Sequence, residues 1–222
     1  MDIVQKLIKK EEERQQNTIG LIASENFASK AVRNAVKSVF MHKYSEGYPH
    51  ARYYEGNEVV DELEDLCRQE ILKLFNLSND EWHVNVQPLS GSIANLAVYN
   101  SILEPGDTIL SMFLPDGGHL SHGWSYGNQE SFSEDFKNLS ESIYLGGNRK
   151  VSFVSKIYNV IQYKTNPKTF LFDYDEIEKI ALKVKPKLII TGGTAYPRNI
   201  DYERISEIAK KVGALYHADC AP

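Results

Sequence analysis

Apolar residues recur at helical spacing in the first third of the chain. Residues 3–16 place Ile3, Val4, Leu7 and Ile8 opposite a charged face, which predicts an amphipathic helix. We expect another subunit to cover this stripe. Residues 31–39 predict a short second helix and residues 59–74 a third, longer one. The intervening residues 44–57 have no regular period but contain four tyrosines, so we expect an ordered functional loop.

Short strands and helices alternate in the rest of the chain. After an extended run at residues 83–87, the pattern predicts strands at 108–113, 187–191 and 214–218, with helices at 93–103 and 202–212. This alternation predicts right-handed βαβ units and a mainly parallel sheet, which is an α/β fold. Residues 128–150 are polar, and we interpret them as a surface insertion.

Composition narrows the class of protein. The chain has 222 residues, of which 42% are hydrophobic and 25% charged, so a packed core is expected and a disordered or fibrous chain is excluded. A net charge of −5 argues against nucleic acid as a partner. No apolar run reaches the ~18 residues of a membrane span, and no signal peptide is evident. With only two cysteines, the chain is expected to be cytoplasmic.

Two segments fit the ends of a bound cofactor. Ser90, Gly91 and Ser92 lie where an extended run opens a helix, and helix N-termini bind phosphate; an ordinary serine cap is the alternative. Asp219 follows a buried strand, where its carboxylate could pair with a protonated ring nitrogen. A helix cap or a solvated position in a loop is the alternative. If the first interpretation holds, Ser90 and Asp219 must share a cavity.

Two further segments carry titratable groups. His119 and His122 follow Gly117 and Gly118, and stacking on a flat cofactor or a hydrogen-bonded core position is favoured over metal binding, because no third ligand is evident. Glu46 lies among tyrosines, where desolvation could raise its pKa and make it a proton donor. A packed aromatic loop with one exposed acid is the alternative.

Six segments together indicate a family. In order they are LIASEN (21–26), KYSEGYP (43–49), RYY (52–54), NVQP (85–88), SGS (90–92) and GGHL (117–120). From about residue 7 to residue 221, apart from 128–150, the chain resembles the N-terminal part of the serine hydroxymethyltransferase family. The resemblance implies a fold-type-I, three-layer α/β/α large domain that binds pyridoxal 5′-phosphate (PLP). It also implies interconversion of serine and glycine, with tetrahydrofolate as the one-carbon acceptor.

The resemblance assigns roles by position. For the cofactor, Ser90, Gly91 and Ser92 would hold the phosphate, His119 would stack on the ring, Asp219 would pair with the ring nitrogen and Thr194 would lie near the ring hydroxyl. For the substrate, Ser24 would bind the carboxylate, Glu46 would transfer a proton and Tyr54 would line the site. Leu114, Gly118, His119 and Leu120 would contact the folate. Tyr44 would reach the phosphate of a neighbouring subunit, so the resemblance implies a homo-oligomer with shared active sites.

Departures from the family pattern limit these expectations. Pro222 stands where the family has His, and Glu55 stands where it has Gly. The chain stops before the family's Schiff-base lysine and its carboxylate-binding arginine, so we expect it to be catalytically incompetent alone. We expect residues 1–58 to form a helical arm with the active-site loop and 59–222 a partial PLP-binding domain. The alternatives are a non-catalytic fragment or pseudoenzyme, and a folate-independent, aldolase-like PLP lyase.

Overall fold

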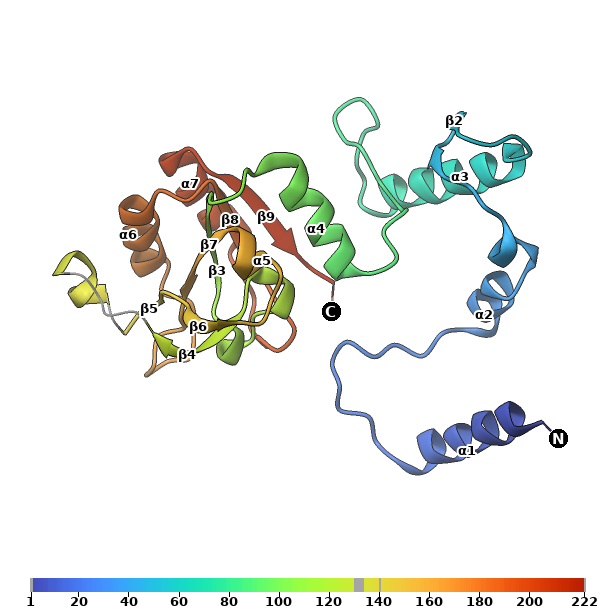
Figure 1. Ribbon diagram of the computed structural model, residues 1–222, viewed down its shortest axis with the longest axis horizontal. Coiled ribbons are helices and arrows are strands. Elements are labelled where there is room, and N and C mark those ends of the chain that lie inside the picture. The colour runs from blue at the N-terminus through green and yellow to red at the C-terminus, as the bar shows by residue number, and fades with distance from the viewer. Residues whose placement is uncertain (1, 130–133, 140, 222) are drawn as a thin grey trace. The chain divides into compact units, whose positions relative to one another are not determined.

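The computed structural model describes residues 2–129, 134–139 and 141–221 (Figure 1). The chain divides into two compact units: Asn26–Leu89 forms one, and Met1–Glu25 together with Ser90–Pro222 forms the other. The predicted boundary after residue 58 stays a prediction.

A five-stranded sheet forms the centre of the larger unit. Its order is β5 (Ile143–Tyr144), β7 (Asn159–Tyr163), β3 (Thr108–Met112), β8 (Leu188–Gly192) and β9 (Leu215–Asp219). The last four strands are parallel, and β5 pairs antiparallel with β7. Every residue of β8 is buried, as expected for a central strand covered on both faces.

Helices cover both faces of this sheet (Figure 1). On one face, Ile109 and Leu188 pack with Tyr99 of α4 (Gly91–Ile102) and with α5 (Val154–Ile157). On the other, Leu110 and Ile189 pack with α6 (Tyr174–Val184) and α7 (Tyr202–Val212). Adjacent strand residues point to opposite faces, so one apolar run supplies both cores. The unit therefore has the three layers that were expected.

The smaller unit is built on one long helix. It contains α2 (Lys30–Val36), η1 (Val39–His42), the hairpin of β1 (Gly47–Tyr48) and β2 (Ala51–Arg52), and α3 (Glu58–Leu74). The hairpin pairs Gly47 with Arg52 and Tyr48 with Ala51. Residues 83–87, expected to be extended, belong to no described strand.

The N-terminal helix α1 (Ile3–Asn17) leaves its apolar stripe exposed. Ile3, Val4, Leu7 and Ile8 are each more than half exposed, and α1 has no buried residue. Cover from another subunit stays a prediction. No helix in the described part of the chain combines the length and apolar character needed to cross a membrane.

Residues 128–150 are more integrated than expected. β4 (Ser125–Gln129) pairs with β6 (Gly147–Lys150), and η4 (Glu134–Leu139) lies between them in sequence. Ile143 and Tyr144 are buried in the central sheet, so describing the whole segment as surface was wrong. Residues 130–133 and 140 lie outside the described residues, and an insertion relative to the family stays a prediction. The sequence patterns also missed β7 and α6 altogether.

Candidate active site

A cavity of about 280 Å³ lies beside the carboxyl ends of the parallel strands. Asp219 ends β9, Gly193 and Thr194 follow β8, and His119 lies in the loop after β3. Ligands of open α/β sheets bind at this edge. Ser90 and Asp219 line the same cavity, as the cofactor interpretation required. The full lining is Ser24, Ser90, Gly91, Ser92, His119, Gly193, Thr194, Asp219 and Ala221.

The start of α4 offers hydrogen-bond donors to this cavity. Ser90 is the N-cap, and its Oγ accepts a hydrogen bond from the backbone nitrogen of Ile93 at 3.4 Å. The serine cap considered from sequence is therefore present. The first backbone N–H groups of a helix lack intrahelical partners, so the same turn is also suited to an anion.

Asp219 is held by three donors. Its Oδ2 accepts from Nδ2 of Asn95 and from Nε2 of His122, each at 2.9 Å, and its Oδ1 accepts from the Ala221 backbone nitrogen at 3.2 Å. The hydrogen bond from His122 is the main reason why the pKa of Asp219 lies well below its ordinary value, although burial opposes the shift. Asp219 is thus ionised at neutral pH and can pair with a cation.

His119 is a neutral ring at the same cavity. Its Nδ1 accepts a hydrogen bond from the Ser121 backbone nitrogen at 3.2 Å and lies 2.7 Å from Oγ of Ser121. Burial, reinforced by the nearby His122, lowers its pKa. The imidazole of His119 is therefore uncharged at neutral pH.

Asp219 also lies near two histidines, and together they form a cluster of possible metal ligands that the sequence did not reveal. Ligand atoms of His119, His122 and Asp219 lie within 4.8 Å of one another, close enough to hold a metal ion. However, Nε2 of His122 is already hydrogen-bonded to Asp219. The expectation of no metal stays a prediction. Asp219 lies 97 residues beyond His122, so no local spacing could have shown this proximity.

The loops after β3 and β8 are tied together. The carbonyl oxygen of Gly117 accepts from the backbone nitrogens of Thr194 at 2.9 Å and Ala195 at 3.2 Å. A Cβ on Gly193 would lie 2.1 Å from that same oxygen, so only glycine fits there. Gly193 is a lining residue that the sequence patterns missed.

The residues expected to contact folate lie in and around the first of these loops. Leu114 begins η2 (Leu114–Asp116) and is partly buried, whereas Leu120 begins η3 (Leu120–His122) and is half exposed. A Cβ on Gly118 would lie 2.5 Å from the backbone oxygen of Met112, so the chain turns back tightly on β3. Their contact with folate stays a prediction.

Tyr44, Glu46 and Tyr54 belong to the smaller unit. The Tyr44 hydroxyl donates to Oε2 of Glu46 at 2.9 Å, and the Tyr44 and Tyr54 rings meet edge to face with centroids 5.2 Å apart. The hydrogen bond to the Glu46 carboxylate raises the pKa of Tyr44. The proton-donor role of Glu46 stays a prediction.

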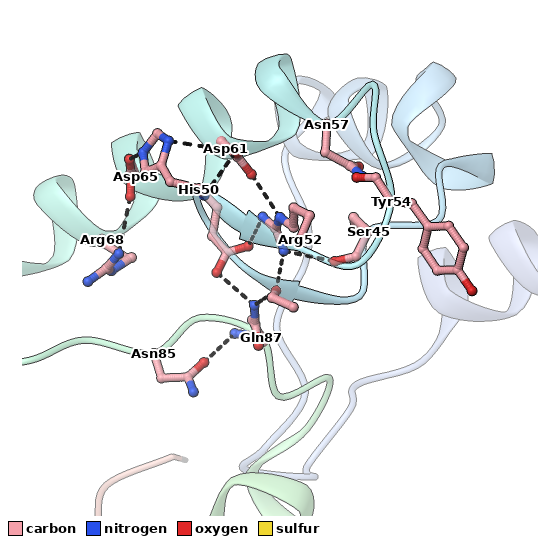
Figure 2. Close-up of polar contacts among 12 residues, drawn as sticks. Ser45, His50, Arg52, Tyr54, Asn57, Asp61, Asp65, Arg68, Asn85 and Gln87 are labelled. Carbon is pink, nitrogen blue, oxygen red and sulfur yellow. Dashed lines mark hydrogen bonds and ion pairs between the residues drawn. The ribbon is translucent and has the colours of Figure 1, made fainter.

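The guanidinium of Arg52 is buried and contacts several polar groups around this loop (Figure 2). Arg52 contacts Asp61 through Nε and Glu64 through Nη2, each at 2.7 Å. Its Nη1 donates to the backbone oxygens of Ser45 and Gly47, the residues on either side of Glu46. The Glu46 carbonyl in turn accepts from the backbone nitrogen of Tyr53 at 3.1 Å. The backbone of Glu46 is thus fixed on both sides.

Comparisons with known proteins decide the family. The family model described as serine hydroxymethyltransferase matches residues 2–222. The chain belongs to the serine hydroxymethyltransferase family. The fold-type-I PLP-enzyme architecture implied by the resemblance is therefore confirmed.

Similar proteins from a yeast, a plant and a bacterium are also named serine hydroxymethyltransferase. The chain is 47% identical to the cytosolic serine hydroxymethyltransferase of Saccharomyces cerevisiae over 98% of its own length and 42% of the relative. It is 47% identical to serine hydroxymethyltransferase 4 of Arabidopsis thaliana, over 97% of the chain and 42% of that protein. It is 48% identical to the serine hydroxymethyltransferase of Coprothermobacter proteolyticus, over 97% of the chain and 45% of that protein. The chain thus spans less than half the length of these curated relatives.

Proposed function

We propose that this chain supplies part of the active site of a PLP-dependent serine hydroxymethyltransferase, which interconverts serine and glycine and passes a one-carbon unit to tetrahydrofolate. The observation that carries the proposal is the single cavity lined by both Ser90 and Asp219. It places a helix N-terminus suited to phosphate beside an ionised carboxylate suited to a protonated ring nitrogen.

The donor set fits the cofactor. Ser90, Gly91 and Ser92 would hold the phosphate, and Thr194 would donate near the ring hydroxyl. Asp219 would keep a proton on the ring nitrogen, and neutral His119 would pack against the ring. Bound PLP supplies an electron sink for a carbanion at the substrate.

The remaining roles concern substrate, folate and partner. Ser24 would bind the substrate carboxylate, Glu46 would move a proton at the substrate hydroxyl, and Tyr54 would line that site. Leu114, Gly118, His119 and Leu120 would contact the pterin. Tyr44 would reach the phosphate bound by a second copy in a homo-oligomer. A cytoplasmic location is supported by the cytosolic names of the yeast relatives.

Reversible PLP binding tests the cofactor proposal directly. The described lining of the cavity contains no lysine, so binding is measured by absorbance and by quenching of protein fluorescence with added PLP. We expect saturable binding by the full chain, weakened about tenfold or more by Asp219→Asn because a charged hydrogen bond is lost. Asp175→Asn, at a side chain 82% exposed, is the matched control. Equal affinity in all three proteins would contradict the proposal.

A chimaera tests the reaction. This chain replaces the matching segment of the Coprothermobacter proteolyticus relative, and serine cleavage is measured with and without tetrahydrofolate. We expect folate-dependent cleavage that Glu46→Gln abolishes. Cleavage that ignores folate would identify an aldolase-like lyase, and a folded, PLP-loaded but inactive chimaera would identify a non-catalytic segment.

A further inference from the structure

An unbroken line of polar contacts runs behind the cavity from β9 through α4 to the loop after β3 that holds His119 and Ser121. We infer that Asn95, oriented by His217, is a positioning residue that fixes the carboxylate of Asp219 and, through Ser121, the tautomer of His119. Its catalytic meaning rests on the proposed function, but the geometry does not.

Asn95 is at the centre of this network. Its side chain lies on α4 and is buried, with the residue only 4% exposed, and it is not part of the cavity lining. Nδ2 donates to Oδ2 of Asp219 and to Oγ of Ser121, both at 2.9 Å. Oδ1 lies 2.9 Å from Nε2 of His217. Both amide hydrogens and the amide oxygen are therefore used.

The charge on Asp219 decides which way the amide points. An ionised carboxylate only accepts hydrogen bonds, so the nitrogen of Asn95 must face it and the oxygen must face His217. His217 must then donate through Nε2. Burial lowers the pKa of His217, so the ring is neutral and its proton is on Nε2.

The hydrogen bond between Asn95 and Ser121 also determines which nitrogen of His119 carries the proton. Because Ser121 Oγ accepts from Asn95, its own proton is free for Nδ1 of His119, 2.7 Å away. The Ser121 backbone nitrogen also donates to Nδ1. Two donors at Nδ1 leave no place for a proton there, so neutral His119 carries its proton on Nε2.

Removing Asn95 should therefore change His119 through Ser121. Without the amide, the Ser121 hydroxyl can rotate to accept from a protonated Nδ1, and the Ser121 backbone nitrogen, 3.2 Å away, is then the one remaining donor of the two that oppose a proton there. The second tautomer and the imidazolium then become accessible, and the pKa of His119 rises. At the same time Asp219 loses one of two donors to Oδ2 and is held less firmly.

The test is ¹⁵N NMR of the full chain labelled at histidine, without cofactor, across a pH titration. We expect an unprotonated Nδ1 and a protonated Nε2 for His119 in the unchanged chain. Asn95→Ala should give a mixture of tautomers and about a tenfold loss of PLP affinity. His217→Phe should shift His119 in the same direction, and His217→Gln, which keeps a donor, should restore the original signals. Asn159→Ala, at an exposed asparagine, is the control.

The outcomes separate this inference from the proposed function. A proton on Nδ1 of His119 in the unchanged chain overturns the inference whether or not the variants fold. Unaltered His119 signals in a folded Asn95→Ala chain overturn it as well, even if PLP binds. If the tautomer responds as expected but PLP does not bind, the inference holds and the proposed function fails.

Discussion

The Nε atom of Arg52 lies 2.7 Å from the Oδ1 atom of Asp61, and the two side chains are only 5% and 10% exposed. A buried ion pair of this kind contributes little when intact, but breaking it leaves an uncompensated charge. Here the charges left behind would be those of Asp61 and of Glu64, the second carboxylate that Arg52 contacts. The pair therefore makes the smaller unit sensitive to one side chain.

We expect Arg52→Ala to destabilise the smaller unit by about 3 kcal/mol. The chain has two tryptophans, and only Trp82 lies in this unit. Urea unfolding followed by fluorescence in a Trp124→Phe background therefore reports on it alone. Lys73→Ala, which removes an exposed partner of Glu70, is the control and should change stability by less than about 0.5 kcal/mol. Equal effects of the two substitutions would refute the argument.

The neutral histidines predict a pH dependence of stability. Burial lowers the pKa of both His119 and His217 in the folded chain, whereas unfolded histidine titrates near 6.5. As the pH falls below about 6.5, these histidines bind protons in the unfolded chain before they do so in the folded chain. The free energy of unfolding is therefore highest above this pH and declines below it.

His217→Gln should weaken this pH dependence. One proton accounts for at most about 1.4 kcal/mol per pH unit, so the slope of unfolding free energy between pH 7 and 5 should fall by less than that amount. Urea unfolding at several pH values measures it, with His42→Gln as the control at an exposed position. An unchanged slope would show that His217 titrates normally when folded.

Gly192 predicts a steric effect on Asp219. Its φ is +97°, and a Cβ there would lie 1.8 Å from the carbonyl oxygen of Asp219. Gly106 has a similar φ of +91° but open space around it. We expect Gly106→Ala to cost about 1 kcal/mol through backbone strain alone, and Gly192→Ala to cost more than about 3 kcal/mol. Denaturation measures both, and PLP titration should show weaker binding only for Gly192→Ala.

Ser90 and Ser92 separate capping from phosphate binding. The Ser90 side chain caps α4, so Ser90→Ala should lower stability by about 1 kcal/mol as well as weaken PLP binding. Ser92→Ala should weaken PLP binding several-fold without loss of stability. Thermal unfolding and PLP titration of each variant decide between the roles. Full PLP affinity in Ser92→Ala would remove Ser92 from the phosphate site.

Local patterns predicted the elements whose apolar residues are regular. The helix at 202–212 matches α7, because Ile205, Ile208 and Ala209 recur on one face and Gly213 ends it in a left-handed conformation. The strand β7 was not predicted because its polar Asn159 and Gln162 interrupt the apolar run, although Gln162 is buried. In α6, Ile177, Ile180 and Ala181 have helical spacing, so the sequence does carry a pattern that predicts this helix.

The candidate site was predictable only in part. Motifs identified most of the cavity lining, because loops at strand ends and helix starts carry recognisable residues. They pointed to no role for Asn95 or His217, whose side chains meet although the two residues lie 122 residues apart. Arg52 was visible only as part of a motif. Its role depends on carboxylates of α3 that come nine and twelve residues later.

The hydrogen bonds from Thr194 and Ala195 to the Gly117 carbonyl make two distant loops a single mechanical part. A substitution that displaces the backbone at Gly117 is therefore expected to displace residues 193–195 as well. Changes to the cavity edge of this chain are therefore best designed on the pair of loops together, although the two loops are far apart in sequence.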